Sequence, residues 1–236
     1  MRGRGGVKGA TTLNDTASTE SGRVTPLSKT AKLMARHMIH AWQAPMFALG
    51  CEIDMTAAME GRAAGVTVTD VILSACVRTL PGHSKLNAHY RDDAIVEFDD
   101  VNIGLAVAAE KGLTVPVIHA AQSLSLTEIA ARRRDLVEKT RAGRVRITDV
   151  TGGTFTVSNL GMFDITRFTA IINPPQVAIL AVGSVNRRHV WNGGDPQWRP
   201  ISEFTLTCDH RAVDGAAGAA FLGALKKQLE GKQPAT

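Results

Sequence analysis

The hydrophobic positions of this chain begin to recur with helical spacing at about residue 25. A first helix is predicted to open at Thr25-Pro26, because threonine is a good cap and proline suits the first helical position, and to close before Pro45. Its apolar positions recur every three or four residues: Leu27, Ala31, Met34, Met38 and Trp42. Residues 69–80 are apolar on nearly every side and stop at Pro81, which predicts a helix inside the core.

Two further helices are predicted in the second half of the chain. Ser125 and Glu128 have the spacing of a capping box, and Gly143 suits the end of the helix that they open. One stripe follows that helix: Leu126, Ile129, Arg133, Leu136, Val137 and Thr140. The last helix is predicted to start near Asp214 and to end around Gly231.

Strand-like segments separate these helices. They are predicted at residues 47–54, 87–90, 94–98, 102–109, 113–118, 154–158, 177–185 and 201–208, with hairpin turns at 91–93 and 110–112. We therefore expect one mixed α/β domain over residues 23–236, in which helices cover a largely antiparallel or mixed sheet. Residues 1–22 are rich in Gly, Ser, Thr and Asn and are predicted to be a flexible linker.

Composition narrows the function classes. No apolar run approaches the roughly 20 residues of a membrane-spanning helix, and no secretory signal is visible, so neither membrane insertion nor secretion is expected. The net charge of +5 is dispersed apart from Arg132, Arg133 and Arg134, which we interpret as a solvated helix face, and aromatic residues make up only 5%, so no nucleic-acid surface is indicated. Three widely spaced cysteines outside any CxxC pair predict reduced intracellular thiols and no metal site.

The segment 207–215 carries the clearest chemistry. His210 is predicted at the end of a strand, where it can be held rigidly and still face a cleft. Imidazole accepts a proton near neutral pH and could deprotonate a thiol, although the ring could instead be satisfied by Asp209 or Asp214. Cys208 is predicted to be core, because residues two apart on a strand lie roughly 6.6 Å apart, too far for a Cys–His pair.

The motif Asp-His-Arg-x-x-Asp-Gly at residues 209–215 resembles the signature of the dihydrolipoamide acyltransferase catalytic domain, which is similar in fold to chloramphenicol acetyltransferase. Residues 25–28, 112–118, 153–161 and 168–183 resemble further blocks of that family, so the resemblance extends over about residues 25–231. It implies an α/β fold with a two-layer mixed sheet and helices, and a coenzyme A-dependent acyltransferase.

The resemblance also implies roles for single residues. His210 would be the general base that takes the thiol proton, and Ser158 would donate a hydrogen bond to the tetrahedral oxyanion. Without the resemblance, the preferred interpretation of Ser158 is a turn residue that caps residues 159–161. Asp214 would support the active site, with a helix cap as the alternative or additional role. Arg211 would anchor the loop through an ion pair. No coenzyme A-contacting residue is assigned.

The assembly implied by the resemblance is a homotrimer in which His210 of one subunit meets Ser158 of its neighbour. Coenzyme A and the lipoyl arm would enter that channel from opposite ends, and association of trimers into a cubic or dodecahedral core is left open. The partners would be a decarboxylase component, dihydrolipoamide dehydrogenase and a lipoyl domain. That domain is absent from these 236 residues, so we expect a truncated form or a natural catalytic core. The expected compartment is the cytoplasm, or the mitochondrial matrix in a eukaryote.

The acyl group is predicted to be acetyl, because residues 158–163 and 171–176 are most similar to the pyruvate dehydrogenase type. Branched-chain acyl and succinyl groups remain alternatives, since discrimination depends on pocket volume. Two other functions stay open: a stand-alone coenzyme A-dependent acyltransferase with a small acceptor, and a non-catalytic scaffold core.

Overall fold

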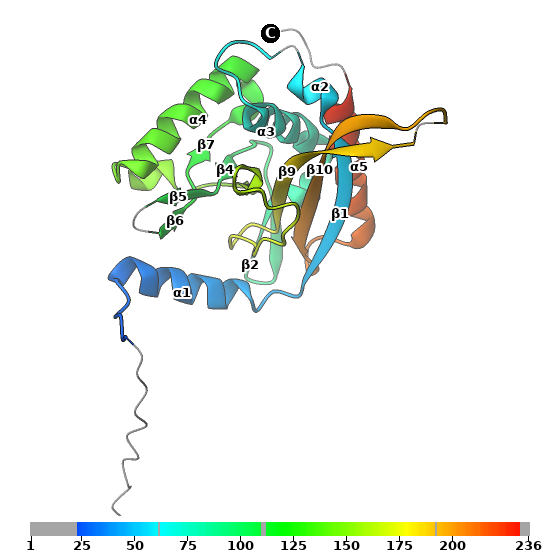
Figure 1. Ribbon diagram of the computed structural model, residues 1–236. Coiled ribbons are helices and arrows are strands. Elements are labelled where there is room, and N and C mark those ends of the chain that lie inside the picture. Colours follow the sequence, from blue (N-terminus) through cyan, green and yellow to red (C-terminus); the bar gives the residue numbers. More distant parts are fainter. Residues whose placement is uncertain (1–22, 61, 110–111, 192, 232–236) are drawn as a thin grey trace, which may run out of the picture.

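A computed structural model describes residues 23–60, 62–109, 112–191 and 193–231 (Figure 1). Within these ranges six strands form one sheet in the order β1-β10-β9-β8-β4-β7. Their bounds are β1 Met46–Asp54, β4 Ile103–Leu105, β7 Val117–Ile118, β8 Phe155–Asn159, β9 Ala178–Val190 and β10 Gln197–Asp209. Strand β8 runs parallel to both β4 and β9, whereas the other neighbours are antiparallel. The predicted mixed α/β fold is confirmed.

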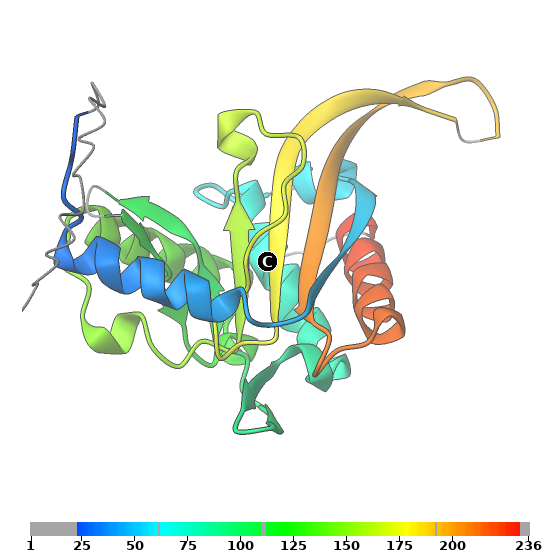
Figure 2. The same cartoon turned by 90° about the horizontal axis from the view of Figure 1, so that it is seen from below.

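Helices cover the sheet and close the core. They are α2 Thr56–Met59, α3 Val68–Thr79, α4 Leu126–Arg141 and α5 Gly215–Glu230. Helix α3 packs against α4 and α5, and α5 lies beside β1 (Figure 2). The core lies between these helices and the sheet, where Phe155, Phe204 and Phe221 are fully buried. None of the helices in the described ranges has the length and apolarity needed to cross a bilayer.

Three helices begin and end close to their predicted bounds. Helix α3 is buried from Asp70 to Cys76, as its apolar sequence predicts. The capping box of α4 is present, because the Ser125 hydroxyl accepts from the Glu128 N–H while the Glu128 carboxylate accepts from Ser125. Helix α5 is capped by Asp214, as predicted. Local capping signals therefore placed these ends.

The predicted start of the first helix is wrong by a few residues. Helix α1 spans Lys29–Ala41 and is capped by Ser28, whose hydroxyl accepts a hydrogen bond of 3.1 Å from the Ala31 N–H. Thr25 and Pro26 precede the helix. Ser28, three residues after Thr25, is an equally suitable N-cap residue, and in the structure it is Ser28 that caps the helix. Helix α1 lies below the sheet, apart from the other helices (Figure 1).

Two hairpins form small sheets of their own. Strands β2 (Ala88–Arg91) and β3 (Ala94–Glu97) flank a turn in which Asp92 and Asp93 have positive φ. The strands predicted at 102–109 and 113–118 are each divided between the main sheet and a second hairpin, β5 (Val107–Ala109) with β6 (Gly112–Thr114). Pro116, which has no N–H for a ladder bond, lies at one of these breaks. Residues 110 and 111 of the predicted turn, like the predicted linker 1–22, lie outside the described residues.

Strands β9 and β10 extend further than predicted. Beyond residue 185 they continue as a two-stranded arm that projects from the sheet (Figures 1 and 2). The arm carries polar residues and two exposed tryptophans, Trp191 and Trp198. Because it lies outside the core, it has no buried face and therefore no alternating pattern for the sequence to display.

Candidate active site

The loop after β10 holds His210 firmly while leaving its side chain exposed. The His210 N–H donates a hydrogen bond of 3.0 Å to the Pro45 carbonyl, and the preceding Asp209 N–H donates to Val177. The imidazole packs against Phe47 of β1, with ring centroids 4.7 Å apart. A rigid backbone with an accessible imidazole is what a general base requires.

Asp209 and Arg211 form an ion pair around His210, which confirms the loop anchor predicted for Arg211. The Arg211 Nη2 lies 2.6 Å from Asp209 Oδ2, and its Nε lies 3.0 Å from Oδ1. Asp209 is buried, and a buried carboxylate without a partner would destabilise the fold. The contacts with Arg211 compensate that charge. Within the described ranges neither Asp209 nor Asp214 hydrogen-bonds the His210 ring, which leaves the imidazole available to a substrate.

Asp214 caps helix α5, as the alternative role predicted. Its Oδ1 accepts a hydrogen bond of 2.8 Å from the Ala217 N–H. This bond is the main reason that the pKa of Asp214 is lowered, and the positive charge of Lys85 adds to the effect. The cap orients the first turn of α5 relative to the loop, whereas a supporting role for Asp214 in catalysis stays a prediction.

Cys208 is a core residue, as predicted from its position on the strand. It is fully buried, and burial together with the negative charge of Asp209 raises the pKa of its thiol to about 12. A protonated, inaccessible thiol is a poor nucleophile.

Ser158 lies on β8 and lines a hollow of about 250 Å³. The rest of the lining is mainly apolar, with two arginines: Thr69, Leu105, Ala106, Val107, Ala108, Leu113, Arg133, Val137, Arg141, Asn159, Leu160, Met162 and Phe163. Asn159 caps the turn, because its Oδ1 accepts from Gly161 N–H at 2.8 Å while its amide nitrogen donates to Thr69. In the described part of the chain the Ser158 hydroxyl has no hydrogen bond, so it is free to donate to a ligand.

Arg133 corrects the prediction of a solvated arginine face. Its guanidinium binds Asp70 of α3, with Nε 2.5 Å from Oδ1 and Nη2 3.2 Å from Oδ2, and the Asp70 side chain is fully buried. Arg132 and Arg134 are exposed, as predicted. The available signal was that Arg133 falls on the same helical stripe as Ile129 and Leu136, which faces the core.

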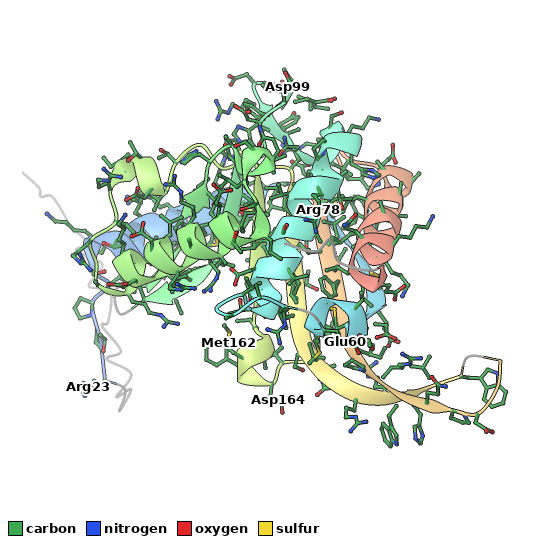
Figure 3. All side chains as sticks on the ribbon, turned by 90° about the horizontal axis from the view of Figure 1, so that it is seen from above. Arg23, Glu60, Arg78, Asp99, Met162 and Asp164 are labelled. Atoms are coloured by element: carbon green, nitrogen blue, oxygen red, sulfur yellow. The ribbon has the colours of Figure 1, made fainter. Side chains whose placement is uncertain are left out.

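The two candidate catalytic residues do not meet within one chain. Strand pairing sets Ser158 level with Ala181, and Ala181 level with Thr205. His210 follows Thr205 by five residues, so the two Cα atoms are separated by roughly 17 Å along the strands and roughly 10 Å across them. In Figure 3, Met162, which follows Ser158 by four residues, is set well apart from Asp99, which follows the β2–β3 hairpin. Asp209 and Arg211, on either side of His210 in the sequence, line a hollow of about 550 Å³ that is separate from the hollow lined by Ser158.

Sequence comparison gives a family for this arrangement. Residues 19–236 match the model of the 2-oxoacid dehydrogenases acyltransferase catalytic domain. The chain is 34% identical over 239 residues to the dihydrolipoyllysine-residue acetyltransferase component of pyruvate dehydrogenase complex of Rickettsia bellii, covering 96% of this chain and 57% of the relative. It is 41% identical over 165 residues to the corresponding component of the acetoin cleaving system of Bacillus subtilis, covering 70% and 42%. The chain thus spans about half the length of the curated relatives that it matches.

Solved structures that superpose on this chain come from dihydrolipoamide acetyltransferases as well. A probable dihydrolipoamide acetyltransferase from Listeria monocytogenes superposes with a TM-score of 0.87 at 31% identity, covering 91% of this chain and 97% of that one. The dihydrolipoamide acetyltransferase of Azotobacter vinelandii, studied for the roles of a serine, a histidine and an asparagine in its mechanism, gives 0.87 at 31%, covering 92% and 94%.

A chloramphenicol acetyltransferase shares the fold alone, with a TM-score of 0.54 at 16% identity, covering 83% of this chain and 92% of that one. The predicted fold likeness is therefore confirmed. The match over residues 19–236, together with the superposed structures, shows that this chain belongs to the family of 2-oxoacid dehydrogenase acyltransferases, in the catalytic domain.

Proposed function

We propose that this domain transfers an acetyl group between a dihydrolipoyl thiol and coenzyme A. The observation that carries the proposal is a spacing. His210 follows Ser158 by 52 residues and precedes Asp214 by four, and the serine, histidine and asparagine studied in the Azotobacter enzyme have the same spacing. The exposed His210 imidazole and the unbonded Ser158 hydroxyl have the properties that the two roles need. Asp214 departs from the amide of that enzyme.

In the proposed reaction His210 takes the proton from the attacking thiol. The thiolate sulfur forms a bond to the thioester carbonyl carbon, and the resulting oxyanion accepts a hydrogen bond from Ser158. The intermediate collapses with cleavage of the original carbon–sulfur bond, and the departing thiolate takes the proton back from His210. Atoms and charge balance, and the reaction is reversible because both thioesters have similar chemistry.

The active site is proposed to form between two subunits of a homotrimer. The separation of His210 from Ser158 within one chain supports this, because a donor that far away cannot reach the oxyanion. A solved relative that superposes with a TM-score of 0.86 at 30% identity is the cubic core of a pyruvate dehydrogenase multienzyme complex. A larger core, a lipoyl domain, and decarboxylase and dihydrolipoamide dehydrogenase partners are proposed on the same ground.

The relatives' names favour acetyl over the branched-chain and succinyl alternatives. The Rickettsia and Bacillus proteins are both acetyltransferase components, one of a pyruvate dehydrogenase complex and one of an acetoin cleaving system. Either parent complex would therefore present an acetyl group to this domain. Since relatives are found in bacteria and in plant mitochondria, the proposed compartment is the bacterial cytoplasm or the mitochondrial matrix.

The decisive experiment is transfer to free dihydrolipoamide from acetyl-, isobutyryl- or succinyl-coenzyme A. We expect the acetyl donor to have the largest kcat/KM. A preference for another donor would overturn the acetyl assignment, and transfer to a small acceptor but not to dihydrolipoamide would favour the stand-alone enzyme. An assembled protein that transfers nothing would leave the scaffold role.

A further inference from the structure

The β2–β3 hairpin contacts the catalytic loop through one aromatic ring. The guanidinium carbon of Arg211 lies 3.9 Å from the centroid of the Tyr90 ring, so the cation packs on the aromatic face. The edge of the same guanidinium binds the buried carboxylate of Asp209. Arg211 is therefore held on its edge by one residue and on its face by another.

Tyr90 is itself fixed at both ends. Its backbone N–H donates a hydrogen bond of 2.9 Å to the Pro175 carbonyl, next to the main sheet. Its hydroxyl donates a bond of 2.6 Å to Asp93, in the turn of the hairpin. That bond to a carboxylate is the main reason that the pKa of Tyr90 is raised, because ionisation of the phenol would place a second negative charge beside Asp93. The ring is held in place before Arg211 packs on it.

The support matters because Arg211 is accessible to water. Its side chain is 39% exposed, whereas that of its partner Asp209 is 2% exposed. Partly exposed ion pairs are weakened by solvent and by the freedom of a long side chain. A ring that covers one face of the guanidinium restricts that freedom. His210 is the residue between Asp209 and Arg211, so whatever steadies this pair also steadies its backbone.

We propose that Tyr90 is a positioning residue for His210, an inference that rests on the proposed acetyl transfer. Tyr90 holds Arg211 against Asp209 and thereby fixes the loop on both sides of the general base. It acts through Arg211 and is not assigned any contact with the substrate. The hairpin, which belongs to no part of the main sheet, gains a function as the support of the catalytic loop.

The activity test compares Tyr90→Leu with the matched variant Tyr90→Phe. Losing the aromatic face is expected to lower kcat about five- to tenfold, whereas Phe keeps the face and stays within about twofold of wild type. The KM for coenzyme A should not change in either variant. Equal kcat for the two variants, or a loss confined to KM, would overturn the inference. A wild type without any transfer would refute the proposed function instead.

A double variant protects the test against a general folding defect. Lysine keeps the charge of Arg211 but has no planar face, so Tyr90→Leu should lower kcat by less than about twofold in an Arg211→Lys background. Independent, multiplicative losses would show that Tyr90 acts by another route and would overturn the proposal. Each variant is compared at equal oligomer size, measured by light scattering.

The geometry can also be tested without activity, because Tyr90 is the single tyrosine of the chain. Its ionisation can be followed by ultraviolet absorbance as the pH is raised. In Asp93→Asn the phenol loses its carboxylate partner, and its pKa is expected to fall towards the ordinary value near 10. An unchanged titration in Asp93→Asn would show that Tyr90 is not held as described.

Discussion

The loop that carries His210 and the turn that follows Ser158 are held by contacts of different range. On the His210 side, the ion pair joins residues only two apart in the sequence, Asp209 and Arg211. On the Ser158 side, Asn159 binds Thr69, which is 90 residues away, and Arg133 on the same hollow binds Asp70 across 63 residues. The ion pair on the His210 side lies within its own motif and is supported from outside by Pro45 and Tyr90, whereas the Ser158 side depends on the packing of α3, α4 and β8.

Because of this difference, substitutions on the two sides of the site are expected to affect different properties, the reaction or the stability of the fold. A change at the exposed His210 imidazole should affect the reaction while leaving the fold intact, because the core does not depend on that side chain. A change in the long-range contacts should affect the fold first, because a buried ion pair loses one partner. The variants below test that separation.

Replacing His210 by alanine should have the largest effect. Loss of the general base is expected to lower kcat about a thousandfold, within the range of about 10²–10⁴ typical for such catalysis. Steady-state transfer from acetyl-coenzyme A to dihydrolipoamide measures the loss, and the unfolding midpoint should match that of wild type. His119→Gln removes another exposed imidazole and serves as the control. A His210→Ala enzyme within tenfold of wild type would refute the assignment.

Ser158→Ala should lower kcat about a hundredfold, as loss of one oxyanion donor does, without loss of stability. Coexpressed with His210→Ala, it should regain activity, because a mixed trimer has one interface where an intact His210 faces an intact Ser158. With random mixing of subunits in a closed head-to-tail trimer, about a quarter of the sites are restored. Tagged subunits purified in tandem give the measurement. No recovery in verified mixed trimers would contradict a site shared between subunits.

Asp70→Asn should act on stability first. The fully buried Asp70 binds Arg133 and accepts hydrogen bonds from Thr67, the N-cap of α3, so its neutralisation is expected to lower the free energy of unfolding by about 2–3 kcal/mol. The matched control is Asp135→Asn, which breaks the exposed Asp135–Lys139 pair of α4 and should cost less than about 1 kcal/mol. Urea unfolding of both variants measures the two losses. Equal losses would mean that the long-range pair is no more important than a surface pair.

Asp214→Asn should have the smallest effect, and one that depends on pH. Asparagine is also a good helix cap, so α5 keeps its start. The folded-state pKa of Asp214 is lowered, so its charge stabilises the fold above the unfolded value near 3.9, and this contribution is lost as the pH falls through the folded pKa. Unfolding midpoints of the two proteins should therefore differ at neutral pH and converge in acid. A difference that grew with acidity would have the wrong sign.

Helix ends were predictable wherever the signal lies within one turn. The capping box at Ser125 and the cap at Asp214 were read from a few adjacent residues, and the structure has both. The same local logic failed at α1, where Thr25 and Ser28 are both acceptable caps and the local sequence does not distinguish between them. It also missed the arm of β9 and β10, which has no buried face to produce an alternating pattern.

Spacings of a few residues were enough to predict the motif around His210, the burial of Cys208 and the mixed α/β order of elements. The folded packing was needed to show that Arg133 pairs with the buried carboxylate of Asp70 and that the Tyr90 ring supports Arg211. It also decided that Ser158 and His210 of one chain lie apart. Such contacts depend on strand register and helix packing, which are set by the sum of many weak interactions across the whole core.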